Sequence, residues 1–224
     1  MNNDSPAVVQ TLHSINEIVD NLLLLLSEKE KSVITKRFNL DNKGKHTLEA
    51  IGKEFSVTRE RIRQIENNGL NKMKRNVFNT ALKSLHDFVG SYVRERGGLY
   101  RHDTLVNDLI KLTNQESIHT PSINLSLVLH EDLETVGNTI NFHPYIRIKD
   151  MRDHSIKHAS NHLINQLHKH GDVRHVEKIH NDSKDYFSDI GYDLHKLKSL
   201  VDIDKRLTLL EEAMVGLQEW RHIN

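Results

Sequence analysis

This chain of 224 residues has no cysteine, few aromatic residues and no long apolar segment. The absence of cysteine excludes disulfides and thiolate metal ligands. Aromatic residues make up 5% of the chain, which disfavours a surface that stacks single-stranded bases on rings. No apolar run is long enough for a transmembrane helix, and the N-terminus shows no signal-peptide pattern. These absences predict a soluble, cytoplasmic protein without a membrane partner.

Motifs of common catalytic sites are also missing from the sequence. We find no Gly-rich phosphate loop, no nucleophile elbow and no clustered carboxylate motif. Histidines spaced by four, His154, His158 and His162, share one predicted helix, but no carboxylate or cysteine stands beside them at metal-ligand spacing. We therefore expect no enzyme activity, no metal and no other cofactor.

Charge is balanced over the whole chain but not along it. Lys and Arg number 31, as do Asp and Glu, so the formal net charge is zero. Between Thr58 and Arg75, however, six Lys and Arg stand against two Glu. A surface that binds phosphates must therefore be local, and this stretch is where we expect it.

The stretch from Thr47 to Arg75 predicts a helix-turn-helix. The first helix covers Thr47–Phe55, where Gly52 lets a second helix approach closely. Ser56 and Val57 form the turn, and the hydroxyl of Thr58 is a good N-cap for the second helix. Two helices in this order are typical of proteins that read double-stranded DNA.

The second helix has one apolar face and one face suited to DNA. Ile62 and Met73 lie on the first; Arg63 and Gln64 lie on the other. Arg can bind guanine in a bidentate manner, Gln can bind adenine, and Glu accepts from the cytosine amino group. The alternative is a solvated polar helix face. The residues expected to bind DNA are Thr58, Arg59, Glu60, Arg61, Arg63, Gln64, Asn67, Lys72, Lys74 and Arg75.

Three segments carry a resemblance to a known family: Leu26–Glu30, Arg37–Asp41 and Thr47–Glu66. Together they resemble region 4, the promoter-reading domain of bacterial sigma-70 family sigma factors, which binds the −35 element. The resemblance covers residues 22 to 76. It implies a promoter-like site on double-stranded DNA, contact with the β flap of RNA polymerase, and a location on the nucleoid. By the same resemblance, Arg59, Glu60, Arg63 and Gln64 contact bases or nearby phosphates, and Arg61 contacts the backbone.

The chain departs from this family in two places. Asn67, Asn68 and Gly69 stand where the family commonly has an Ala-rich helix, and Gly in a helix costs ~1 kcal/mol relative to Ala. We expect a weakened or kinked helix there. The residues before the resembling segment are too few for the domains with which a sigma factor melts DNA. We therefore expect that the chain is not a self-sufficient sigma factor.

The remaining sequence predicts further helices and two hairpins. Val8–Leu25 is helical by its apolar spacing, and Ser27 with Glu30 is a capping box for a helix to Phe38, followed by a loop from Asn39 to His46. Two regions then share the order of helices followed by a hairpin, which is typical of a winged helix. The predicted helices are Val77–Arg96, Thr104–Lys111, Ile123–Val136, Ser155–His170, Val176–Tyr186 and Asp189–Leu200, and the closing strands lie near Ile148, in Leu207–Leu210 and in Met214–Trp220.

A repeated motif supports two tandem copies. Gly98–His102 and Gly171–His175 share Gly-x-x-Arg-His at an offset of 73 residues. The two copies resemble HARE-type helix-turn-helix domains, which are winged helices also found in the delta subunit of RNA polymerase. For Arg101 and Arg174 a structural role competes with contact to phosphate or protein, and we favour the structural role.

The sequence therefore predicts a mainly α fold, in which a sigma-like helix-turn-helix domain is followed by two small winged-helix-like α+β domains. Their expected limits are residues 1–76, 77–150 and 151–224. The favoured function is a sequence-specific DNA-binding transcriptional regulator that contacts RNA polymerase. Two alternatives stay open: a delta-like polymerase accessory protein that acts mainly through protein contacts, and the targeting part of a DNA-modifying system.

Overall fold

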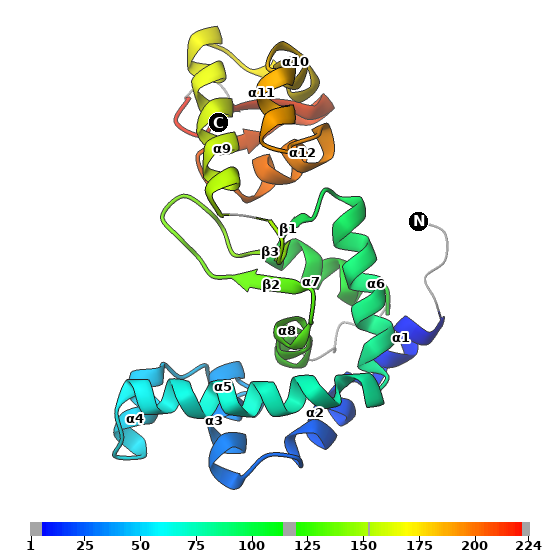
Figure 1. The fold of residues 1–224 in the computed structure, drawn as a ribbon, viewed down its shortest axis with the longest axis vertical. Coiled ribbons are helices and arrows are strands. Elements are labelled where there is room, and N and C mark those ends of the chain that lie inside the picture. Colours follow the sequence, from blue (N-terminus) through cyan, green and yellow to red (C-terminus); the bar gives the residue numbers. More distant parts are fainter. Residues whose placement is uncertain (1–5, 114–119, 152, 221–224) are drawn as a thin grey trace. The chain divides into compact units, whose positions relative to one another are not determined.

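The computed structural model describes residues 6–113, 120–151 and 153–220. In this part of the chain the fold is mainly α: a helix-turn-helix segment is followed by two small α+β modules, the first from Leu82 to Ile148 and the second from Asp153 to Leu217 (Figure 1). The helices are α1 (Pro6–His13), α2 (Ile15–Leu23), α3 (Glu28–Phe38), α4 (Leu48–Glu54), α5 (Arg59–Asn76), α6 (Leu82–Glu95), α7 (His102–Lys111), α8 (Thr120–Leu129), α9 (Asp153–His170), α10 (Val176–Asp182), α11 (Lys184–Asp189) and α12 (Leu194–Ile203). The strands are β1 (Leu99–Arg101), β2 (Leu133–Val136), β3 (Tyr145–Ile148), β4 (Arg174–His175), β5 (Leu207–Leu209) and β6 (Met214–Leu217).

The described residues form two compact units. The first falls within Met1–Val89 and Val106–Glu131, and the second falls within Gly90–Leu105 and Asp132–Asn224. The three expected domains, with boundaries at residues 76 and 150, stay a prediction.

The capping box expected before α3 is confirmed. The backbone N–H of Ser27 donates to Glu30 Oε2 at 2.9 Å, and the Glu30 N–H donates back to Ser27 Oγ at 3.4 Å. Asn39 ends the helix in the left-handed region, with φ of 58°. The helix expected over Val8–Leu25 is instead two helices, because α1 ends at His13 and α2 begins at Ile15.

Helix α5 continues without interruption through Gly69, where the sequence predicts a weakened or kinked helix. A Cβ atom at Gly69 would lie 3.3 Å from Ile34 Cγ1 of α3. Glycine therefore lets α3 and α5 approach closely, and this packing offsets its poor helix propensity.

Helix α8 is enclosed within the first unit, where it packs against α2, α3 and α5. Most of its residues are buried, as expected of a helix without a solvated polar face. Ser122 Oγ, on α8, donates to Asn16 Oδ1 at 2.7 Å, so this buried hydroxyl has a partner. The buried residues of α8 are Ser122, Ile123, Leu125, Ser126, Leu127 and Leu129.

The second unit holds two antiparallel three-stranded sheets of the same topology. Their strand orders are β1-β3-β2 and β4-β6-β5, so the last strand is central in each. Gly98 and Gly171, with φ of 77° and 80°, precede the first strand of each sheet. Helices followed by a hairpin therefore occur in both regions, but each region also has a first strand, β1 or β4, that was not predicted, and within the described residues the second region has one helix more. The helix expected over Ile123–Val136 is wrong at its end, because Leu133–Val136 is β2 and pairs with β3.

Helix α12 is also covered on one side, by the segment that leads into β1. Ser199 Oγ donates to the carbonyl of Arg96 at 2.7 Å. A Cβ at Gly97 would lie 2.6 Å from the backbone nitrogen of Lys196, so only glycine fits there. Helix α12, the last helix of the second module, therefore packs on this segment, and its buried residues are Leu197, Leu200, Val201 and Ile203.

Two histidines are buried together in the first unit. His86 and His130 are 6% and 4% exposed, and their rings stack with centroids 4.8 Å apart. His86 Nε2 lies 3.0 Å from the Ser126 carbonyl oxygen, and His130 Nε2 lies 2.9 Å from the His86 carbonyl oxygen. Burial, and then the charge of His130, lower the pKa of His86 from 6.5 to about 4. The folded protein therefore holds a neutral imidazole here.

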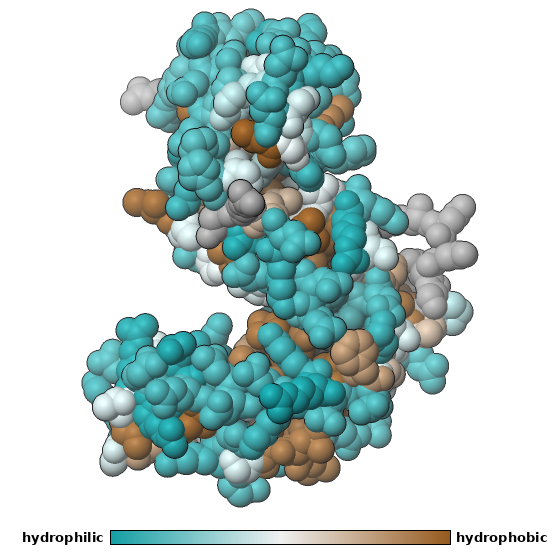
Figure 2. Space-filling model, in the orientation of Figure 1, coloured by the Kyte–Doolittle hydropathy of each residue, from teal (hydrophilic) through white to brown (hydrophobic). Residues whose placement is uncertain are grey.

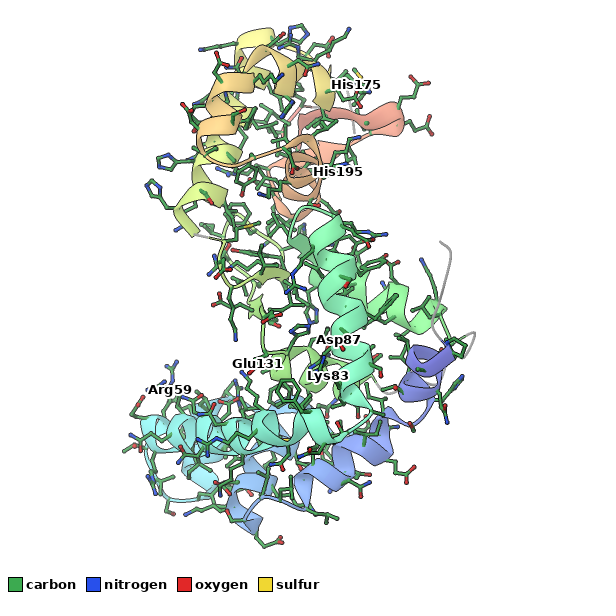
Figure 3. All side chains as sticks on the ribbon, turned by 45° about the vertical axis from the view of Figure 1, so that its right-hand side comes forward. Arg59, Lys83, Asp87, Glu131, His175 and His195 are labelled. Carbon is green, nitrogen blue, oxygen red and sulfur yellow. The ribbon has the colours of Figure 1, made fainter. Side chains whose placement is uncertain are left out.

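We predict that acid destabilises the first unit through His86. Its folded pKa lies below its unfolded pKa, so stability is complete above pH 6.5 and falls as the pH drops toward 4, by about 3 kcal/mol in total. Urea unfolding at several pH values measures this slope. Asp87 and Lys83, which neighbour His86 on α6 (Figure 3), act on the same pKa in opposite directions.

The matched variant for this measurement is His86→Gln. Its side-chain amide can still donate to the Ser126 carbonyl but cannot titrate. We expect a flatter dependence on pH between 4 and 6.5. Equal slopes for the variant and the natural chain would show that another group causes the effect.

Candidate nucleic-acid interface

The helix-turn-helix is formed by α4, a short turn and α5. Thr47 Oγ1 accepts from Ala50 N at 3.1 Å, and Thr58 Oγ1 accepts from Arg61 N at 3.2 Å, so each helix has a hydroxyl N-cap. A Cβ at Gly52 would lie 2.8 Å from the Val57 carbonyl oxygen. The expected roles of Thr58 and Gly52 are thereby confirmed.

One face of α5 belongs to a small apolar core. Ile62 and Ile65 pack with Val33 of α3 and Ile51 of α4. Gly69 and Met73 continue the same buried face toward the C-terminal end of α5. The opposite face is therefore turned to solvent, as the periodicity predicts.

Nine of the ten expected DNA-binding residues are exposed, and Lys74 is half-buried. Figure 2 shows a mostly hydrophilic surface over α4 and α5. Arg59 lies at the N-terminal end of α5 and extends away from the helix (Figure 3). The N-terminal half of α5, with Arg63 and Gln64, presents hydrogen-bonding groups of the kind that read base edges. The nine exposed residues are Thr58, Arg59, Glu60, Arg61, Arg63, Gln64, Asn67, Lys72 and Arg75.

Two pairs of side chains order this face. Arg63 binds Glu60 in a bidentate manner, with Nε 2.9 Å from Oε2 and Nη2 2.7 Å from Oε1. The hydrogen bond from Arg63 lowers the pKa of Glu60, and Glu60 raises the pKa of Arg63. Arg61 Nη1 donates to Gln64 Oε1 at 3.2 Å.

Lys72 stands apart from the other expected contacts because it pairs with α3. Its Nζ lies 2.8 Å from Glu30 Oε2, and the side chain of Glu30 is only 11% exposed. This hydrogen bond from Lys72 is the main cause of the lowered pKa of Glu30. The structure therefore gives Lys72 a role in joining α5 to α3.

The pairing of Arg37 with Glu66 was not anticipated from the sequence. Arg37 Nε donates to Glu66 Oε1 at 3.0 Å, and its Nη1 donates to the His46 carbonyl at 2.9 Å. Arg37 thus joins α3, the loop before α4, and α5. A separation of 29 residues leaves no local spacing signal that could have revealed this contact.

Positive charge is concentrated in this part of the chain. Residues 22–75 contain thirteen Lys and Arg against seven Asp and Glu, whereas the remaining residues contain eighteen against twenty-four. A local excess of positive charge favours contact with DNA phosphates.

The comparisons with known proteins identify the same segment. Residues 22–75 match sigma-70 region 4. The RNA polymerase sigma factor RpoD of Neisseria gonorrhoeae is 40% identical over 86 residues, which are 38% of this chain and 13% of that protein. SigA of Lactococcus lactis subsp. cremoris is 41% identical over 71 residues, 32% of this chain and 20% of that protein. SigA of a Bacillus species is 43% identical over 70 residues, 31% of this chain and 19% of that protein.

The likeness is therefore local. It confirms the expected resemblance to region 4 and supports a DNA-binding role related to RNA polymerase for this segment. The chain spans no more than a fifth of the length of these relatives.

Other groups that the sequence singled out lie in the second unit. His154 and His158 stack on each other, with ring centroids 3.8 Å apart, whereas His162 stacks on Tyr186. Among the described residues, no three His, Asp or Glu side chains form a group that could hold a metal. No helix in the described ranges is both long and apolar enough to cross a membrane.

The two arginines of the repeated motif have carboxylate partners nearby. Arg101 Nε donates to Asp103 Oδ1 at 2.7 Å, and Arg174 pairs with Asp182. These ion pairs are consistent with the structural role that we favoured for both.

We predict that Lys72→Ala lowers stability, by about 1 kcal/mol, while leaving base preference on DNA intact. The partly buried Glu30 carboxylate would lose its cationic partner. Urea unfolding measures the loss of stability, and binding to a selected duplex and its single-base-pair variants measures the base preference. Arg75→Ala, on the exposed side of the same helical turn, is the control and should leave stability almost unchanged. A loss of base preference in Lys72→Ala would place Lys72 in the reading face.

Proposed function

We propose that this chain is a sequence-specific DNA-binding transcriptional regulator, and that it reads a promoter-like site through the N-terminal half of α5. The observation that carries the proposal is the exposed face of α5, whose apolar side is held by α3 and α4. The match of residues 22–75 to sigma-70 region 4 supports the same proposal. No catalytic role is part of it.

We further propose that RNA polymerase is the protein partner, contacted at the flap of its β subunit. The named relatives are RNA polymerase sigma factors, which supports a polymerase partner for the matching segment. The HARE-type resemblance of the α+β modules, shared with the polymerase delta subunit, remains a prediction and favours the same partner.

The packing of the two modules supports a model in which one part of the chain binds DNA and another part binds protein. A winged helix reads the major groove with its recognition helix, which must be exposed. In the first module α8 is enclosed by α2, α3 and α5, and in the second module α12 packs on the segment leading into β1. We therefore assign base reading to α5 and protein contacts to the modules.

The alternative is a delta-like accessory protein that acts mainly through protein contacts. Its DNA binding would be weak and without sequence preference, whereas a regulator shows salt-dependent, sequence-selective affinity. Selection of bound duplexes from a random pool, followed by capture of purified RNA polymerase, separates the two. A preferred duplex supports the regulator, and capture of polymerase without a preferred duplex supports the accessory protein.

We predict that Arg63→Ala and Gln64→Ala each weaken binding to the preferred duplex by ~1–3 kcal/mol and relax its sequence preference, since each removes a bidentate base contact. Lys74→Ala serves as the comparison and should weaken all duplexes alike, as a phosphate contact does. Repeating the duplex selection with each variant measures both effects. Unchanged preference in both Arg63→Ala and Gln64→Ala would refute α5 as the reading helix.

A further inference from the structure

The bidentate pair between Glu60 and Arg63 lies at the centre of the proposed reading face. Arg63 Nε lies 2.9 Å from Glu60 Oε2, and Arg63 Nη2 lies 2.7 Å from Glu60 Oε1. The two residues are three apart on α5, so both side chains extend from the same face of the helix. The pair is solvent-exposed, with 59% and 53% of the two side chains accessible. It therefore orders the guanidinium without removing it from solvent.

The geometry of the guanidinium leaves one edge for DNA. Arg carries five N–H donors in a planar fork. The contact with Glu60 uses the edge formed by Nε and Nη2. The adjacent edge, formed by Nη1 and the second hydrogen of Nη2, has the spacing that matches guanine O6 and N7. Arg63 can thus hold Glu60 and read guanine at the same time.

We propose that Glu60 is a positioning residue, which turns the outer edge of Arg63 toward guanine and keeps Arg63 from binding phosphates at other DNA sequences. This inference rests on the proposed function of α5. It assigns the specificity of Arg63 to a second residue on the same helix.

Two physical effects follow from removing the Glu60 carboxylate. Arg63 would lose its fixed orientation, so ordering it on guanine would cost side-chain entropy. It would also lose the carboxylate that neutralises its charge, which favours contact with any phosphate. The first effect lowers affinity for the preferred site, and the second raises affinity for all other sites.

Arg61 provides a contrast on the same helix. Its Nη1 donates a single hydrogen bond to the neutral Gln64 Oε1 at 3.2 Å, and no bidentate clamp forms. Its positive charge is not neutralised by that partner. Arg61 is therefore suited to phosphate, while Arg63, clamped by a carboxylate, is suited to a base edge.

The test compares Glu60→Gln, Arg63→Ala and the double variant on three sets of DNA. These are the preferred duplex, its single-base-pair variants and an unrelated duplex, each at several salt concentrations. We expect Glu60→Gln to lose roughly ten-fold discrimination at the same base pair as Arg63→Ala, and the double variant to lose no more than Arg63→Ala does. On the unrelated duplex, Glu60→Gln should bind several-fold more tightly, with a log–log salt slope steeper by about one.

Glu28→Gln is the matched control, because it removes the same charge from an exposed position in the first turn of α3. It should leave discrimination at that base pair unchanged. If Glu60→Gln loses discrimination at a different base pair from Arg63→Ala, then Glu60 reads a base itself and the inference is wrong. Unchanged discrimination in Glu60→Gln also overturns the inference. A natural chain with no sequence preference at all would refute the proposed function, and the inference with it.

Discussion

The packing of α3 against α5 is the constraint on which the proposed interface depends. The Glu30 carboxylate accepts from the backbone and hydroxyl of Ser27 and from Lys72 Nζ, so one group both caps α3 and holds α5. Arg37 joins the same helices through Glu66. Gly69 allows the close approach between these two contacts. A helix held at several points along one side presents its other side in a fixed orientation.

The reading face also depends on how charge is distributed within it. Glu30 neutralises Lys72, and Glu60 neutralises Arg63, so basic side chains close together on α5 have different surroundings. Exposed ion pairs contribute little to stability, ~0–1 kcal/mol, because solvent screens them. Their value on a nucleic-acid surface lies in orientation and in the sign of the local charge. A count of Lys and Arg therefore overstates how many cations this surface offers to phosphates.

Helix-turn-helix elements and the α5 periodicity could be predicted from the sequence because local rules govern them. Thr58 and Ser27 cap helices through atoms three residues away, and the spacing of Ile62 and Ile65 follows the helical repeat. The prediction of a helix over Ile123–Val136 was wrong at its C-terminal end because a non-local contact decides the structure there. Leu133–Val136 is a strand because it pairs with Tyr145–Ile148, a partner that helical spacing does not reveal.

The sequence by itself determined the helix-turn-helix, its basic and base-reading side chains, and the repeated order of the two α+β modules. These depend on propensity, capping and motif spacing, which act over a few residues. Only the tertiary structure decided that Lys72 pairs with Glu30, that Arg37 pairs with Glu66, that α8 is buried, and that α12 packs on the segment leading into β1. These contacts are made between residues that are far apart in the chain. They depend on how closely the backbones approach and on which side chains are buried, and no local sequence pattern encodes either.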